Sequence, residues 1–172
     1  MDALVILFVI LLLATFWDYK HGKIPNYLIL TGIVFGMIRL MVREDIFDIV
    51  KYIPGIILPI FLFYPVYKVG GIGAGVIKLF SVLGFYFPFM QSMFCIFTSL
   101  FLAALLSLIK MAYYQNFTER IEYLISYIKD SIILGKFHYY HKDSSTYSKT
   151  ERSQIHLAFP IFLGVLVAGG II

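Results

Sequence analysis

The feature that most limits what this chain can fold into is a series of long apolar runs, such as ALVILFVILLLATFW at residues 3–17. Only 14% of its 172 residues are charged, about half the share in a soluble domain. Water does not tolerate so much exposed apolar surface, so we expect the chain to lie in a lipid bilayer. The runs do not alternate apolar and polar residues as the strands of a membrane barrel do. The sequence therefore predicts an all-α polytopic membrane protein.

Six segments are candidates for crossing the bilayer, which takes about 20 predominantly apolar residues. They are expected to form one membrane domain over residues 1–172. The fourth and fifth are separated by GFYFPFMQ, where a glycine, a proline and a glutamine interrupt the apolar run. The expected spans are about 3–17, 26–42, 49–66, 75–88, 93–113 and 156–172.

The basic residues predict the orientation, because cytosolic loops carry an excess of Lys and Arg. With both chain ends outside (N-out, C-out), 11 of the 14 basic residues fall on the cytosolic side and 3 on the other. The polar loops 18–23, 68–74 and 114–155 are then cytosolic. Apolar residues at helical spacing predict an amphipathic helix over about 118–134, lying on the membrane or packed on the bundle. The net charge of +4, spread in this way, does not indicate nucleic-acid binding.

Two polar stretches could carry chemistry. In the first, FWDYKHGKIPNYLI, Asp18 closes the first predicted helix. Pro25 disfavours helical geometry at Ile24 and suits the first turn of the next helix, where Asn26 can bond free backbone groups. Considered alone, Asp18 is a carboxylate at a helix end in water.

The second stretch, GGIGAGVIK at residues 70–78, places four glycines before an apolar helix. Glycine allows backbone angles closed to other residues and lets another chain approach closely. Irregular backbone at membrane depth is tolerated only against protein or a water-filled cavity, so we expect this loop to line a cavity at the cytosolic face. Lys78 either extends to the membrane interface or faces that cavity. A phosphate-binding loop is a weak alternative, because its Gly-Lys-Ser/Thr ending is absent.

The two stretches together resemble the type IV prepilin peptidases, membrane aspartic proteases of the GxGD type. Members of that family carry an Asp at the end of the first helix and then Ile-Pro-Asn, matched here by Asp18 and by Ile24, Pro25 and Asn26. The resemblance implies an aspartic endopeptidase of the bacterial or archaeal cytoplasmic membrane. Its partners would be the lipid bilayer and a prepilin or pseudopilin helix, whose leader it cleaves in pilus assembly or protein secretion.

The second family motif is Gly-x-Gly-Asp-x-Lys at the start of the fourth helix. Gly73, Gly75 and Lys78 match it, but Val76 stands at the place of the aspartate. The resemblance implies that Asp18 and position 76 face each other across a wet crevice. Hydrolysis by paired carboxylates needs one group to take a proton from water and one to give a proton to the scissile carbonyl. Valine does neither, so we expect little or no peptidase activity.

Several interpretations stay open. The chain is an inactivated variant of a peptidase, a natural pseudo-peptidase that still binds prepilin-like helices, or a peptidase in which another carboxylate acts. A small transporter is the rival class, because glycine breaks beside an intramembrane lysine also suit a permeation site. The lone Cys95 excludes paired-cysteine zinc motifs, so the resemblance is to the short, peptidase-only form, with no metal and no cofactor expected. The candidate substitute carboxylates are Glu119, Glu122, Asp130, Asp143 and Glu151.

Overall fold

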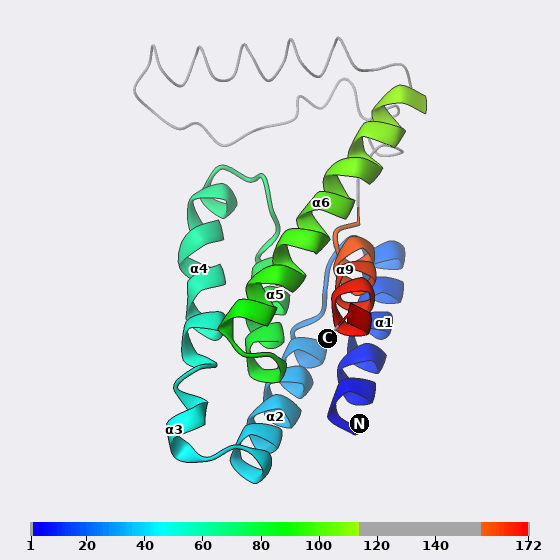
Figure 1. Ribbon diagram of the computed structural model, residues 1–172. Helices are drawn as coiled ribbons and strands as arrows, with labels where there is room; N and C mark the ends of the chain where they lie inside the picture. Colours follow the sequence, from blue (N-terminus) through cyan, green and yellow to red (C-terminus); the bar gives the residue numbers. More distant parts are fainter. Residues whose placement is uncertain (1, 114–155, 172) are drawn as a thin grey trace.

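The computed structural model describes residues 2–113 and 156–171, which are helical apart from short connections (Figure 1). The predicted loop at 114–155, with its amphipathic helix and its five carboxylates, lies outside the described residues. Within the two described ranges no strand occurs, so the all-α prediction is confirmed there. The helices are α1 (Asp2–His21), α2 (Asn26–Arg43), α3 (Ile46–Ile49), α4 (Ile53–Lys68), α5 (Ala74–Tyr86), α6 (Phe89–Tyr113) and α9 (Ala158–Ile171).

Helix α5 lies in the middle of the bundle (Figure 1). It contacts α4 and α2 most extensively and also touches α6 and α1. A helix that is apolar on all sides belongs in the interior, and α5 has almost no polar face. Its buried residues are Val76, Ile77, Leu79, Phe80, Ser81, Val82, Leu83, Gly84 and Tyr86.

Helix α9 packs against α6 and α1, so the last described helix lies beside the first (Figure 1). Two small residues allow the close approach to α6, because a β-carbon on Gly164 would overlap the Ser99 hydroxyl oxygen and backbone. Small residues at helix interfaces are typical of membrane bundles. On the α1 side, the rings of Phe8 and Phe162 meet edge to face with their centroids 6.4 Å apart.

Four stretches of the described chain are long and apolar enough to cross a bilayer: Leu4–His21, Asn26–Arg43, Phe47–Lys68 and Phe89–Tyr113. Helices α5 and α9 have 13 and 14 residues. At about 1.5 Å per residue they rise about 20 Å, which is less than the roughly 30 Å of the hydrocarbon core. Apolar helices therefore occur in all six predicted places, and four of them are candidate spans by length and composition. The six-span topology and the orientation stay predictions.

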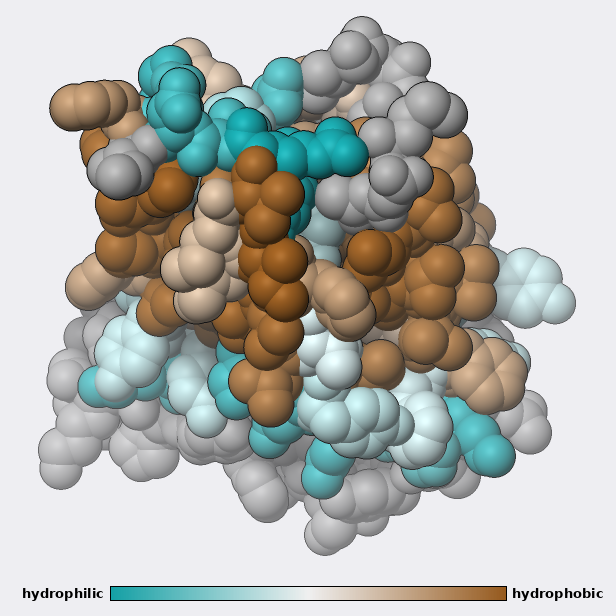
Figure 2. All heavy atoms as spheres, turned by 90° about the horizontal axis from the view of Figure 1, so that it is seen from below, coloured by the Kyte–Doolittle hydropathy of each residue, from teal (hydrophilic) through white to brown (hydrophobic). Residues whose placement is uncertain are grey.

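The outer surface of the bundle is apolar. Seen from below, a broad band of hydrophobic side chains lies between margins of more hydrophilic ones (Figure 2). Large apolar side chains are well exposed on the long helices, among them Val9, Phe61 and Phe101. So much exposed hydrophobic surface suits contact with lipid, and together with the long apolar helices it indicates a multi-pass membrane protein.

Three of the differences from the predicted helix boundaries are larger than two residues. Helix α1 continues past residue 17 to His21, and Gly22, at a φ of 64°, ends it. A positive φ at the residue after a helix is readily adopted by glycine. The predicted span at 49–66 is divided into α3 and α4, where Pro54 in the first turn of α4 has no N–H to continue a helix from residues 50–52. Helix α6 begins earlier than predicted, at Phe89, directly after Pro88.

The backbones of α4 and α5 touch at Gly55 and Gly84. A β-carbon on Gly84 would overlap the Gly55 carbonyl carbon and the Ile56 nitrogen, so only glycine fits there. A β-carbon on Gly55 would instead meet a side chain, with Ser92 Oγ 3.1 Å away. This contact fixes where α5 lies relative to α4.

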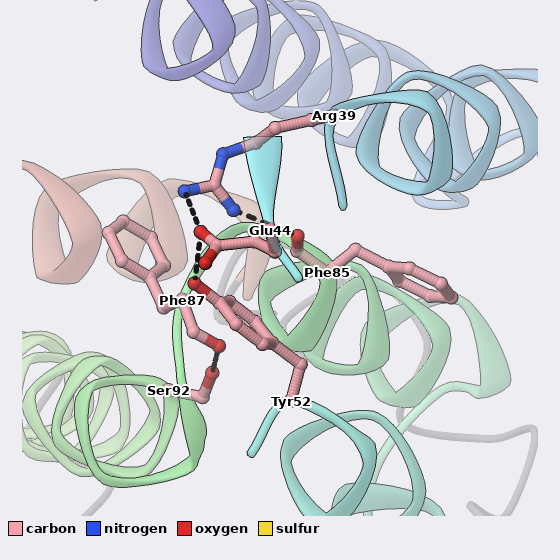
Figure 3. Close-up of polar contacts among 6 residues, drawn as sticks. All are labelled: Arg39, Glu44, Tyr52, Phe85, Phe87 and Ser92. Carbon is pink, nitrogen blue, oxygen red and sulfur yellow. Dashed lines mark hydrogen bonds and ion pairs between the residues drawn. The ribbon is translucent and has the colours of Figure 1, made fainter. Parts of the chain in front are cut away.

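A polar cluster joins the ends of α2 and α5 to the start of α4 (Figure 3). Arg39 Nη1 donates to the Phe85 carbonyl oxygen at 3.4 Å, and Nη2 lies 3.7 Å from Glu44 Oε1. The Tyr52 hydroxyl donates to the same carboxylate oxygen at 2.8 Å. The Arg39 guanidinium also lies 5.8 Å from the centre of the Tyr52 ring. The two motif stretches lie at the opposite ends of α2 and α5, so this cluster holds the far end of the bundle.

Candidate active site

Asp18 is buried in the last turn of α1, with 7% of its surface exposed. Its Oδ2 accepts a hydrogen bond from the backbone N–H of Ala158 at 3.2 Å, and its Oδ1 lies 3.9 Å from Nδ1 of His156. A buried carboxylate is stable only with partners, and the free N–H groups at a helix start favour an anion. The view of Asp18 as a carboxylate in water is therefore wrong, because α9 begins against it.

The start of α9 is bonded to α1 through both backbone groups of Ala158. While Asp18 accepts from the Ala158 N–H, the Thr15 hydroxyl donates to the Ala158 carbonyl oxygen at 3.2 Å and to Leu11 O at 2.8 Å. Thr15 and Asp18 are three positions apart and therefore lie on one face of α1. This pair of contacts, here termed the Ala158 clamp, sets the register between the two helices.

The two motif stretches meet in space. A β-carbon on Gly75 would stand 3.0 Å from Ile24 Cβ and 3.6 Å from Ile24 O, so the first turn of α5 lies directly on the chain before α2. Close by, Lys78 Nζ donates to Asn26 Oδ1 at 3.1 Å. A steric contact and a hydrogen bond thus join the Ile-Pro-Asn stretch to the glycine-rich stretch.

The Asn26 side chain accepts the hydrogen bond from Lys78, a partner that the sequence did not predict for it. Pro25 occupies the N-cap position, just before the first turn in which it was expected, and its carbonyl accepts from the Leu28 N–H at 3.2 Å. Pro25 fits there because its fixed φ suits the residue that leads into a helix. Lys78 is exposed and extends to the neighbouring stretch.

Val76 lies in the first turn of α5, where its N–H bonds to Gly73 O at 3.0 Å. Its side chain is 8% exposed and belongs to the apolar core that also contains Leu11 and Ala14 of α1. Helices α1 and α5 touch, and an acid at position 76 would lie inside the bundle. That Asp18 and position 76 face each other across a water-filled crevice stays a prediction.

The structure explains the glycines of the second stretch in different ways. Gly70 has a φ of 83°, which few other residues adopt, and it ends α4 by bonding to Tyr67 O at 2.9 Å. At Gly75 a β-carbon would crowd Ile24. Gly73 is different, because a β-carbon there would meet nothing within 4 Å. Packing against the described residues therefore does not explain Gly73.

Sequence reasoning missed His156 and the Ala158 N–H. They lie 138 and 140 positions after Asp18, at the start of the last apolar run. No spacing rule links residues so far apart. The one signal was that a titratable side chain precedes an apolar helix predicted to begin on the same side as Asp18.

The bundle and its buried carboxylate define a class: a multi-pass helical membrane protein with a candidate acid–base site where two polar stretches meet. Comparison with protein families matches residues 5–108 to the type IV leader peptidase family. The chain belongs to this family. The matched region contains Asp18 and both motif stretches but ends before α9, so His156 and Ala158 lie outside it. No curated protein and no solved structure matches the chain.

Proposed function

We propose that this chain has the site of an aspartic-type prepilin leader peptidase, that it binds the leader of a type IV prepilin-like protein, and that Val76 prevents efficient cleavage. One observation supports this most strongly. The Ile-Pro-Asn and glycine-rich stretches meet through Gly75 and Ile24, at the end of the bundle where Asp18 is buried. Membership of the type IV leader peptidase family supports the reaction type.

The substrate would place its apolar segment in the bilayer, with its leader at the end of the bundle that carries the motifs. The open space beside Gly73 gives room for an extended peptide backbone. Backbone N–H groups in the first turn of α5 are candidates to bind the oxygen that becomes negative during the reaction. The scissile bond would then lie between α1 and α5.

With an acid at position 76, two carboxylates would share one proton, because two neighbouring like charges cannot both ionise readily. The ionised carboxylate takes a proton from water as the water oxygen attacks the carbonyl carbon. The protonated one gives its proton to the carbonyl oxygen, forming a neutral tetrahedral diol. When the C–N bond breaks, the carboxyl that took the water proton gives it to the amide nitrogen, and the ionised carboxylate takes a hydroxyl proton from the diol. The products are a carboxylic acid and an amine, and the pair again holds one proton.

Valine at position 76 removes one half of this proton exchange. A positioned acid or base is worth about 10²–10⁴-fold in rate, and groups that act together lose more than their separate effects. Asp18 can still accept a proton, but no described α5 residue beside position 76 can donate one to the carbonyl oxygen. We therefore expect binding without efficient turnover.

The test is a set of variants at position 76, incubated with a prepilin in detergent or lipid. Val76→Asp should cleave the leader, and Val76→Asp combined with Asp18→Asn should not. Val76→Asn is the matched control, because it buries a side chain of the same shape that cannot ionise. Cleavage by Val76→Asp alone supports the proposal. Cleavage by the unaltered chain would show that another carboxylate acts, and a chain that neither cleaves after the change nor binds prepilin would contradict it.

If Val76→Asp does not cleave although the unaltered chain binds prepilin tightly, the chain is a pseudo-peptidase rather than an inactivated enzyme. Folding of each variant is checked by its thermal unfolding in detergent, since position 76 is buried. Comparable unfolding temperatures for Val76→Asp and Val76→Asn make the difference in cleavage a chemical one.

A further inference from the structure

We propose that His156 is a positioning residue for Asp18, so that α9 is part of the site although it lies outside the region matched to the family. This inference rests on the proposed function, because it concerns the carboxylate that the reaction uses. Three observations carry it: the orientation of the Asp18 carboxylate, the support of the His156 ring, and the attachment of α9 to its neighbours.

The two oxygens of Asp18 have different partners. Oδ2 is bonded to the Ala158 N–H at 3.2 Å, which fixes the plane of the carboxylate from one side. Oδ1 lies 3.9 Å from His156 Nδ1, which is longer than a hydrogen bond but within reach of one after a small movement. Bonds in active sites are often long without substrate and shorten when it binds. An N–H on Nδ1 would therefore orient Oδ1 during the reaction.

The His156 ring is supported from α1 by the neighbour of Asp18 in sequence. The rings of Tyr19 and His156 lie 5.6 Å apart at a tilt of 59°, and the His156 side chain is 28% exposed. The imidazole is therefore packed on one side and open to water on the other. This arrangement directs Nδ1 toward Asp18 and leaves room for the second ring nitrogen.

The backbone that carries His156 is held at two levels. The Ala158 clamp bonds the start of α9 to α1, and further along the helix Gly164 packs so closely on α6 that a β-carbon there would overlap the Ser99 hydroxyl oxygen. Side chains placed by such packed elements are positioned more accurately than side chains on free loops. The orientation of the Asp18 carboxylate therefore depends on how α9 packs against α1 and α6.

The first test uses the chain with Val76 and needs no turnover. In ¹⁵N-histidine NMR, Asp18→Asn should shift the Nδ1 signal of His156, whereas Asp48→Asn should leave it unchanged. Asp48→Asn is the matched control, because it makes the same change in α3, where Asp48 pairs with Lys51 and not with His156. In thermal unfolding, His156→Leu should lower the midpoint by about 2–4 °C with Asp18 present and by clearly less in the Asp18→Asn chain. An unmoved His156 signal with additive midpoints would overturn the inference.

The second test uses the chain carrying Val76→Asp with a prepilin substrate. Adding His156→Leu should lower kcat about tenfold and leave KM within about twofold, because a misplaced catalytic group slows chemistry more than binding. His156→Asn, whose amide nitrogen can occupy the place of Nδ1, should recover most of kcat. His21→Leu should have no effect.

The outcomes of the two tests separate the two proposals. Equal loss in His156→Leu and His156→Asn, or a change confined to KM, would contradict a positioning role. If the Val76→Asp chain does not cleave at all, the proposal that Val76 prevents cleavage fails, and the NMR and unfolding results alone decide whether His156 orients Asp18.

Discussion

Gly75 lies directly on Ile24, so that a β-carbon at position 75 would stand 3.0 Å from the Ile24 β-carbon. This contact joins the two stretches of sequence that carry the family motifs. It also gives one motif glycine a plain packing reason, whereas Gly73 has open space around it. The two glycines should therefore respond differently to the same substitution.

Gly75→Ala should lower the free energy of unfolding by about 1 kcal/mol, because crowding against Ile24 outweighs the gain in helix propensity. Gly73→Ala should change it by no more than about 0.5 kcal/mol. Chemical or thermal unfolding in detergent measures both. The loss at position 75 should shrink when Ile24→Ala makes room, and equal effects at the two glycines would count against the contact.

Asn26 should be replaceable by an acceptor but not by an apolar residue, since it accepts from Lys78. In the chain carrying Val76→Asp, Asn26→Leu should reduce prepilin cleavage severalfold, whereas Asn26→Asp should retain it by forming an ion pair with Lys78. Stability should change little in either variant, because exposed pairs are worth about 0.2–1 kcal/mol. Cleavage rates that fall alike in both variants would show that the bond between Asn26 and Lys78 does not matter.

Tyr52→Phe should destabilise the far end of the bundle without touching the site. The Tyr52 hydroxyl bonds to Glu44 at 2.8 Å, and a hydrogen bond to a charged group is worth about 1.5–3 kcal/mol. We expect a loss near the lower limit, seen as a lower unfolding temperature, and a smaller loss when Glu44→Gln is already present. Tyr27→Phe, at an exposed position, is the control and should have almost no effect. A similar unfolding temperature for Tyr52→Phe and the parent would refute the role of the cluster.

Gly84→Ala should prevent folding, because its β-carbon would overlap the backbone of α4. Gly55→Ala should be milder, costing about 1–3 kcal/mol, because its β-carbon would crowd the Ser92 side chain and make only an ordinary contact with Gly84 Cα at 3.5 Å. Ser92→Ala should relieve part of that loss, although it also removes the bond of Ser92 Oγ to Phe87 O. The yield of monodisperse protein on size exclusion in detergent separates the two glycines, and equal yields would contradict the backbone contact.

The sequence was sufficient to predict most helix positions, because apolar runs and prolines mark them. The second helix was expected at about 26–42 and is found at Asn26–Arg43, where Pro25 determines the start. The prediction was less accurate for the helix before the glycine-rich stretch, expected at about 49–66 and found at Ile53–Lys68. Hydropathy alone does not register that Pro54 interrupts the run, so α3 and α4 were merged.

Only those residues of the candidate site that belong to the two family motifs were predictable from the sequence. The two polar stretches meet where Gly75 lies against Ile24, and that they form a catalytic site stays a prediction. The bond from Ala158 to Asp18 joins residues 140 positions apart. It depends on how α9 packs between α1 and α6, and neither periodicity nor a local motif encodes that choice of neighbour.

The Ala158 clamp has a consequence for how the protein is made. Translation adds about 5–20 residues per second, so the amide that bonds to Asp18 emerges from the ribosome roughly 7–28 s after the carboxylate does. During that interval Asp18 is without its backbone donor, and the neighbouring helices are already entering the membrane. Asp18 therefore gains its backbone donor only after the chain up to the start of α9 has been made.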